Sequence, residues 1–131
     1  MNEKKEFPQD FYKYLKSHTL IGIKGGDEPR SFLDIWMVEV NERIFARSWN
    51  RSKRSWFTAF VDTGSGQIKY GDKIIGVKGV KLNPENKIQS DIDAAYLSKY
   101  TQPENLSYAE GISQPEYYDY TMELSPEFIG S

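Results

Sequence analysis

The sequence predicts an α+β fold in which antiparallel strands predominate and helices pack outside the sheet or at one end. Short apolar stretches alternate with turns containing Gly or Asn between residues 19 and 83, a pattern typical of strands joined by hairpins. One strongly helical pattern follows, in which Ile88, Ile92, Tyr96 and Tyr100 recur every four residues. The chain has 131 residues and no internal repeat, so we expect a single domain over residues 1–131.

The first predicted element is a short amphipathic helix over residues 7–18. Phe7, Phe11 and Leu15 are spaced four apart, which places them on one helix face. A strand over residues 19–26 follows and ends in a Gly-Gly turn.

The next predicted elements form a hairpin. Apolar residues are nearly continuous toward the end of residues 31–40, which favours one strand covered on both faces. Asn41 and Glu42 are suited to a two-residue turn, and residues 43–49 form the returning strand.

A helix of about three turns is predicted after the returning strand. Ser52 is a favourable N-cap, and Gly64 is a favourable residue at which to end the helix. Residues 67–83 then predict two short strands, with Gly71 and Asp72 in the turn between them.

The helix that contains Ile88 and Tyr100 is the clearest element. Ser90 and Asp93 resemble a capping box at its start, and Pro103 closes it. The stretch over residues 103–120 is rich in turn formers and predicts one helical turn, and residues 118–126 predict the last strand.

The composition excludes several kinds of active site. Without cysteine, the chain has no disulfide, no thiol nucleophile and no thiolate metal site. His18 is the only histidine and lies at a predicted helix end, where a solvated or capping role is expected. Carboxylates are not clustered at ligand spacing, so we expect no metal site, and the sequence identifies no catalytic residue.

The chain also lacks the pattern of a membrane protein. No segment approaches the roughly 18 apolar residues of a membrane span, and the first residues contain no apolar signal core. We therefore expect a soluble, cytoplasmic protein with no membrane partner.

The strongest functional signal lies in residues 47–57, although the chain as a whole has a net charge of -2. This stretch gathers cations, hydroxyls and indole rings: Arg47, Ser48, Trp49, Arg51, Ser52, Lys53, Arg54, Ser55 and Trp56. Cations at a helix start oppose the helix dipole, and the free backbone N–H groups there need acceptors. A bound phosphate resolves both problems, while Trp49 and Trp56 cover an aromatic ring attached to it.

Two other interpretations of this stretch stay open. It is also compatible with a solvated basic helix end whose Trp56 belongs to the core. Basic and aromatic residues together suit single-stranded nucleic acid as well, but the acidic balance of the chain and the shortness of the patch weigh against it.

Several motifs resemble an uncharacterised bacterial family, domain of unknown function 2255. Its members carry Trp-x-Val, a strand ending in Arg-Ser, a Trp at the next helix start, Ala-Tyr-x-x-Lys-Tyr, and a final Thr-x-x-Leu-x-Pro. The matching residues here are Trp36 and Val38, Arg47 and Ser48, Trp56, Ala95 to Tyr100, Thr121, Leu124 and Pro126.

That family is similar to flavin-binding split barrels of the pyridoxamine-phosphate-oxidase and deazaflavin-reductase kind. The resemblance implies an antiparallel split β-barrel of about six strands with flanking helices, forming a homodimer. It also implies that Arg47, Ser48, Ser52 and Lys53 hold the cofactor phosphate, and Arg54 is a further candidate. On this hypothesis Arg47→Ala weakens anion binding with little loss of fold stability.

Two functions follow from the resemblance and stay open. The first is a protein that binds a flavin-type cofactor, FMN or a deazaflavin, and acts as an oxidoreductase on an unidentified substrate. The second is a non-enzymatic split-barrel module that binds another phosphorylated small molecule or a protein partner.

Overall fold

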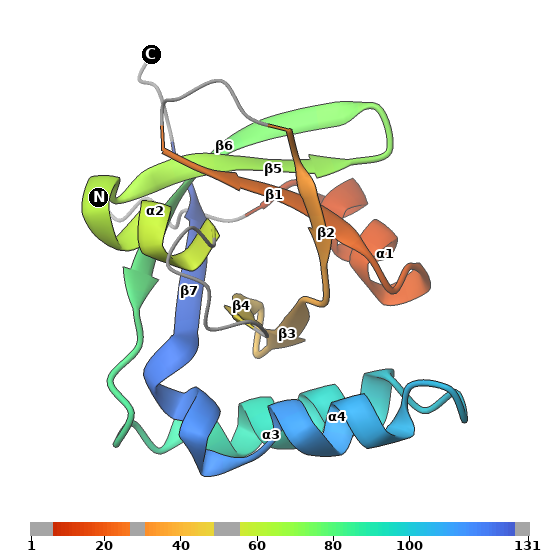
Figure 1. Ribbon diagram of the computed structural model, residues 1–131. Helices are drawn as coiled ribbons and strands as arrows, with labels where there is room; N and C mark the ends of the chain where they lie inside the picture. Colours follow the sequence, from red (N-terminus) through yellow and green to blue (C-terminus); the bar gives the residue numbers. More distant parts are fainter. Residues whose placement is uncertain (1–6, 27–30, 49–55, 128–131) are drawn as a thin grey trace.

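The computed structural model describes residues 7–26, 31–48 and 56–127. Within these ranges, seven antiparallel strands form one sheet that curls into a half-barrel, with helices around it (Figure 1). The strands are β1 (Ile21–Gly25), β2 (Leu33–Ile35), β3 (Val38–Val40), β4 (Arg43–Arg47), β5 (Ser65–Tyr70), β6 (Lys73–Lys81) and β7 (Thr121–Pro126). Their order in the sheet is β2-β1-β5-β6-β7-β4-β3. The predicted fold class is confirmed, with seven strands in place of about six.

Helices cover different parts of this sheet. They are α1 (Gln9–Ser17), α2 (Trp56–Thr63), α3 (Ile88–Lys99), α4 (Leu106–Ile112) and the 3-10 helix η1 (Pro115–Tyr120). Helix α2 contacts β1, β5 and β6, while α3 contacts β3 and α4. In Figure 1, α3 and α4 lie together at one end of the molecule, away from the β5–β6 hairpin. None of the helices over the described residues is long and apolar enough to cross a membrane.

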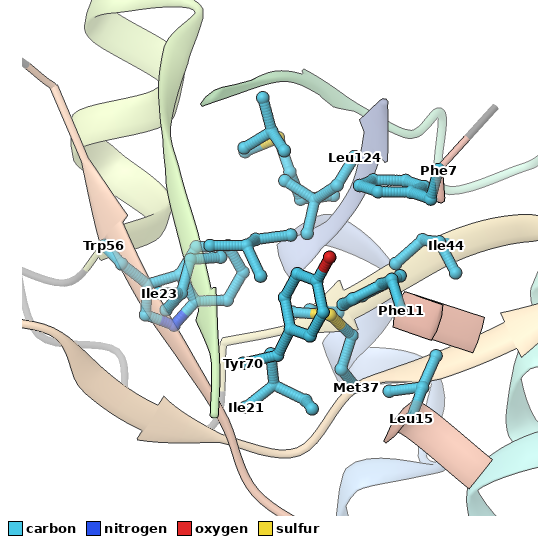
Figure 2. Close-up of a cluster of buried hydrophobic side chains, with 14 of the residues drawn as sticks. Phe7, Phe11, Leu15, Ile21, Ile23, Met37, Ile44, Trp56, Tyr70 and Leu124 are labelled. Carbon is cyan, nitrogen blue, oxygen red and sulfur yellow. The ribbon is translucent and has the colours of Figure 1, made fainter. Parts of the chain in front are cut away.

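Buried apolar side chains form two clusters, one on each side of β4. The larger cluster joins α1 and α2 to the sheet, and Figure 2 shows its members Phe11, Ile23 and Trp56. The smaller cluster joins α3 and α4 to β3 and β4, and includes Ile92 and Tyr96. Burying each of these large side chains stabilises the fold by about 1.5–3 kcal/mol.

Several predicted elements are confirmed. Helix α1, strands β1 and β4, and the β5–β6 hairpin lie where the sequence predicted them. Asn41 and Glu42 have φ angles of 54° and 68°, the left-handed conformation that a two-residue type I′ turn requires. Gly71 in the β5–β6 turn has a φ angle of 61°, which a residue without a Cβ adopts at little cost.

The single strand predicted over residues 31–40 is wrong. This stretch forms β2 and β3, which lie at opposite edges of the sheet. The backbone between them is held by side chains: the Met37 N–H donates to Tyr100 Oη at 3.1 Å, and the Met37 carbonyl accepts from Lys99 Nζ at 2.8 Å. Those bonds replace a strand partner at Met37.

The break between β2 and β3 also explains the curl of the sheet. Only Trp36 and Met37 separate the two edge strands along the chain. Since an extended residue spans at most about 3.6 Å, the two edges of the sheet must lie close together. The short connection therefore forces the seven-stranded sheet to curl toward closure.

The helix predicted around Ile88 is confirmed as α3, but its capping box is wrong. Ser90 Oγ donates to the Lys87 carbonyl at 3.2 Å, and the Asp93 carboxylate bonds with Arg47. Neither side chain therefore forms the reciprocal bonds of a capping box. The predicted end of the preceding helix is confirmed, because Gly64 follows α2 with a φ angle of 78°. The predicted N-cap Ser52 lies outside the described residues.

The stretch before the last strand is more helical than predicted. In place of one helical turn it contains α4 and η1. Because η1 extends to Tyr120, β7 begins at Thr121 and not at residue 118. Side chains of α4 form one wall of the pocket described next.

Candidate functional site

A pocket of about 340 Å³ opens where β2, the end of β4, the start of α2 and helix α4 meet. Most of its lining side chains are aromatic or aliphatic: Leu20, Leu33, Ile35, Trp36, Trp56, Tyr108 and Ile112. The polar lining residues are Asp34, Arg47 and Ser48. We call this cavity the aromatic pocket.

Ring contacts hold the two indoles of the aromatic pocket. Trp36 directly follows β2 and stacks on Tyr100, with ring centroids 3.9 Å apart and planes at 7°. Trp56 is the first residue assigned to α2 and lies edge-on to Phe57 and Phe60 at 5.9 and 6.1 Å. These contacts give the pocket two rigid aromatic walls from segments far apart in the sequence.

The rim of the aromatic pocket is apolar and exposed. Leu20, Leu33 and Tyr108 are 47%, 55% and 52% exposed, although they are large hydrophobic residues. Tyr108 comes from α4, whereas Leu33 belongs to β2 and Leu20 directly precedes β1. A ligand or a second protein surface that covers this rim would remove apolar area from water.

Arg47 ends β4, and its guanidinium is fully committed to protein acceptors. Nη1 donates to Asp93 Oδ1 at 2.6 Å and to the Ile112 carbonyl at 2.9 Å. Nη2 donates to Gln89 Oε1 at 2.8 Å and to the Gln89 carbonyl at 3.2 Å, and Nε donates to Thr121 Oγ1 at 3.0 Å. An arginine carries five N–H donors, so every donor has an acceptor.

These bonds make Arg47 a link between elements. Asp93 and Gln89 belong to α3, Ile112 to α4 and Thr121 to β7. The arginine is only 1% exposed, and its guanidinium lies 5.8 Å from the ring centre of Tyr96 in the smaller apolar cluster. A phosphate contact by Arg47, as the sequence predicted, would have to replace one of these five bonds.

Phenol groups complete the network around Arg47. The Arg47 N–H donates to Tyr96 Oη at 2.9 Å, and burial raises the pKa of Tyr96 to about 12. Tyr118 Oη donates to Asp93 Oδ2 at 2.6 Å, and this bond, together with burial, raises the pKa of Tyr118. Both phenols therefore stay protonated at neutral pH and serve as fixed hydrogen-bonding groups.

The structure brings together three of the seven predicted site residues. Arg47, Ser48 and Trp56 line the aromatic pocket, and the Ser48 N–H donates to the Tyr120 carbonyl at 2.9 Å. The remaining four lie outside the described residues, namely Trp49, Ser52, Lys53 and Arg54. They belong to the segment that joins Ser48 to Trp56, so both of its attachment points are in the wall of the pocket.

Sequence reasoning missed the β2 wall and the α4 wall of the pocket. The α4 wall had a detectable signal, because Leu106, Ala109 and Ile112 recur at helical spacing. The sequence also contains a pattern that could have identified the partners of Arg47. Gln89 and Asp93 are four apart on a predicted helix, which places two polar side chains on one helix face.

Among the described residues, the structure places neither the histidine nor a set of metal ligands at this site. His18 lies after α1, stacked on Tyr14 at 3.7 Å, and does not line the pocket. Among the residues that the structure describes, no group of three His, Cys, Asp or Glu side chains is placed to hold a metal ion. The pocket is equipped to enclose and orient a flat, largely apolar group.

Comparisons with known proteins agree with the fold. Among solved structures, the chain is similar to the conserved hypothetical protein Rv2991 from Mycobacterium tuberculosis, with a TM-score of 0.54 and 10% sequence identity. That likeness covers 95% of this chain and 83% of the other, and at this identity it concerns the fold alone. A search of curated proteins found no match.

A family model assigns the chain more directly. The model described as "Uncharacterized protein conserved in bacteria (DUF2255)" matches residues 21–124. The match includes every strand from β1 to β6 and most of β7, together with the Arg47 network. The chain therefore belongs to this family of uncharacterised proteins conserved in bacteria.

Proposed function

We propose that the protein binds a flavin-type cofactor, FMN or a deazaflavin, with the ring system in the aromatic pocket. The observation that carries this proposal is that Trp36, Trp56 and Tyr108 converge on one cavity beside a basic segment. The cofactor would supply redox chemistry, while the protein binds and orients it. The similarity of the fold to flavin-binding split barrels, inferred from the sequence motifs, supports the same ligand.

The size of the aromatic pocket favours a ligand that is only partly enclosed. Small-molecule sites usually have volumes of about 300–1,000 Å³, and the value of about 340 Å³ lies at the lower end. A flat ring system would be enclosed between aromatic side chains, and the rest of the ligand would extend beyond the pocket.

The phosphate of the cofactor is assigned to the segment that leaves the pocket at Ser48 and returns at Trp56. Its candidate ligands are Ser48, Ser52, Lys53 and Arg54, and Trp49 is a further candidate to cover the ring. Arg47 has a different role in this proposal. It positions the end of β4, from which the segment departs, because its five donors already have acceptors.

One observation favours a second function. Because Arg47 offers no free donor and Asp34 adds a carboxylate, the described walls contribute no free cation for a phosphate, and Ser48 is their one candidate ligand. A non-enzymatic module that binds an uncharged aromatic ligand in the same pocket fits these walls. The two functions differ in whether a phosphate increases affinity.

The homodimer expected from the split-barrel resemblance is part of the proposal. Tyr96 and Tyr100 are fully buried within one chain, so they take no part in such an interface. The exposed rim residues Leu20, Leu33 and Tyr108 are the better candidates. Sedimentation equilibrium should give twice the chain mass at micromolar concentration, and a single chain mass there would remove the dimer.

The test is a titration of the protein with FMN, riboflavin and inorganic phosphate, followed by flavin fluorescence and by thermal unfolding. Cofactor binding predicts that FMN raises the melting temperature and that riboflavin does so far less. Equal binding of FMN and riboflavin would support the uncharged-ligand module. No response to either flavin would contradict the cofactor function.

Two variants and a matched control separate the ring contact from the phosphate contact. Tyr108→Ala removes an exposed ring of the rim and should weaken FMN and riboflavin binding alike. Lys53→Ala should weaken FMN binding about tenfold and leave riboflavin unchanged, as expected for one charge-assisted bond. Lys78→Ala changes an exposed lysine on β6 and should alter neither.

A further inference from the structure

A second cavity adjoins the aromatic pocket and contains two opposite charges. Its volume is about 440 Å³, and it shares Leu20 and Asp34 with the aromatic pocket. Its other lining residues are Tyr14, Gly22, Ser31, Phe32, Lys69 and Gly71. We call this cavity the charged groove. Lys69 and the aromatic residues of the groove take no part in the proposed cofactor site.

The strand register places the two charges of the groove on either side of Gly22. This glycine of β1 pairs with Asp34 of β2 and with Lys69 of β5. Residues paired directly across neighbouring strands project to the same face of the sheet, so both charged side chains stand on one face. Two strand spacings, roughly 10 Å, separate their backbones. The groove therefore has a carboxylate on one side and an ammonium on the other.

The glycine between the two charges keeps the floor of the groove free of side chains. A Cβ added at Gly22 would lie 3.3 Å from the Cβ atoms of both Lys69 and Phe32. Its neighbours would have to move to admit even a methyl group. A glycine inside a strand often marks a place where another group approaches the backbone closely. Here the approach to Gly22 is lined by Asp34 and Lys69.

Neither charge of the groove is satisfied by the part of the chain that the structure describes. Asp34 and Lys69 are exposed, and neither forms an ion pair or a hydrogen bond with a described residue. Lys24, two residues after Gly22 on β1, lies instead over the Phe32 ring, 5.0 Å from its centre. Asp34 and Lys69 are therefore available to a ligand that offers both an ammonium and a carboxylate.

Aromatic side chains give the groove apolar boundaries. The Tyr14 ring from α1 is held by a parallel stack on His18, with centroids 3.7 Å apart and planes at 4°. Gly71 of the β5–β6 turn lies against this ring, since a Cβ there would be 3.6 Å from it. Phe32 and Leu20 line the groove as well. A ligand with an apolar side chain next to its charges would bury that side chain against these residues.

We propose that the charged groove binds a small zwitterion, an α-amino acid with an aromatic side chain. Its ammonium would pair with Asp34 and its carboxylate with Lys69, while its ring would lie against the aromatic residues of the groove. An α-amino acid carries both charges on one carbon atom, so it can bridge the space over Gly22 that separates the two side chains. The aromatic pocket is not needed for this binding, and the proposal does not depend on the cofactor.

Three probes with the same side chain test the two charges separately. Phenylalanine carries both charges, phenylalaninamide lacks the carboxylate, and 3-phenylpropionate lacks the ammonium. Each is titrated into the full chain at about pH 6, where an α-amino group is protonated, and followed by nitrogen-15 correlation spectra. Phenylalanine should shift the backbone amides of Gly22 and Lys69, and it should bind about fivefold more tightly than either other probe, as expected for one exposed ion pair. Equal affinities, or no shift at these amides, would overturn the proposal.

Two variants and a matched control assign each charge to its partner. Lys69→Met should remove the preference for phenylalanine over phenylalaninamide and keep the preference over 3-phenylpropionate, and Asp34→Asn should do the reverse. Lys78→Met changes an exposed lysine on β6, on the same face of the sheet as Lys69, and should alter neither preference. All three side chains are exposed, so the thermal transition should stay unchanged. If each variant loses both preferences, or the control loses one, the two charges are not the ligands of a zwitterion and the proposal fails.

Discussion

Arg47 Nη1 and Asp93 Oδ1 lie 2.6 Å apart, and this ion pair ties the end of β4 to the middle of α3. The arginine side chain is fully buried and that of Asp93 is 20% exposed. The same guanidinium also donates to the backbone carbonyls of Ile112 and Gln89, to the Gln89 side chain and to the Thr121 hydroxyl. The pair therefore lies at the centre of a network that joins α3, α4 and β7 to the wall of the aromatic pocket.

Removing the carboxylate from this pair should destabilise the fold strongly. Asp93→Ala leaves a buried guanidinium without its counter-charge, which costs about 3–5 kcal/mol. Urea unfolding followed by tryptophan fluorescence measures this loss. The matched control is Glu123→Ala, which breaks the exposed pair with Arg43 and should cost less than about 1 kcal/mol. Similar losses in the two variants would show that the Arg47 network is not a structural link.

The core face of α3 should tolerate no charge. Ile92 is fully buried in the cluster between α3, α4 and β3, so Ile92→Asp should prevent folding or lower the melting temperature severely. Leu97 lies on the same helix and is 42% exposed, so Leu97→Asp serves as the control and should leave the transition nearly unchanged. A normal thermal transition for Ile92→Asp would mean that α3 does not pack as described.

The low pKa of Lys99 should make stability depend on pH in a defined window. Burial lowers the pKa to about 8 in the folded chain, against 10.5 in the unfolded chain. Between these values the unfolded chain binds more protons, so the free energy of unfolding should rise with pH. This rise should be measurable up to about pH 9.5. Above that pH the raised pKa of Tyr96 acts in the opposite direction, because the folded chain keeps the phenol proton longer than the unfolded chain and the free energy of unfolding falls with pH.

Comparison with Lys99→Met isolates this contribution. The free energy of unfolding of the wild type, relative to the variant, should increase from about pH 7.5 to about pH 9.5. Urea unfolding at several pH values measures the difference. A difference that stays constant over this range would mean that the amine of Lys99 keeps its ordinary pKa.

The sequence predicted most of the fold because its local signals agree with the tertiary structure. The four-residue spacing around Ile92 predicted α3, and Asn41 with Glu42 predicted the β3–β4 turn. Residues 31–40 were predicted as one strand because periodicity reports burial, not the hydrogen-bond partners of the backbone. The bonds from Tyr100 and Lys99 to Met37 come from residues more than sixty positions away.

The site was predictable only in part for a similar reason. Arg47, Ser48 and Trp56, which the sequence singled out, line one pocket, and their role as cofactor ligands stays a prediction. It could not show that Gln89 and Asp93 occupy the donors of Arg47, because that contact depends on how α3 docks on β4. The expectation that Arg47→Ala leaves stability intact is therefore revised: we now expect a large loss of stability.

The most direct test of the cofactor proposal is a nitrogen-15 correlation spectrum recorded during a titration with FMN. The chain has three tryptophans, so three indole N–H signals are expected and can be assigned by substitution. Binding in the aromatic pocket should shift the indole signals of Trp36 and Trp56 and the backbone amide of Ser48. Unchanged signals for these residues at saturating FMN, or shifts confined to residues around Lys99, would contradict the proposal.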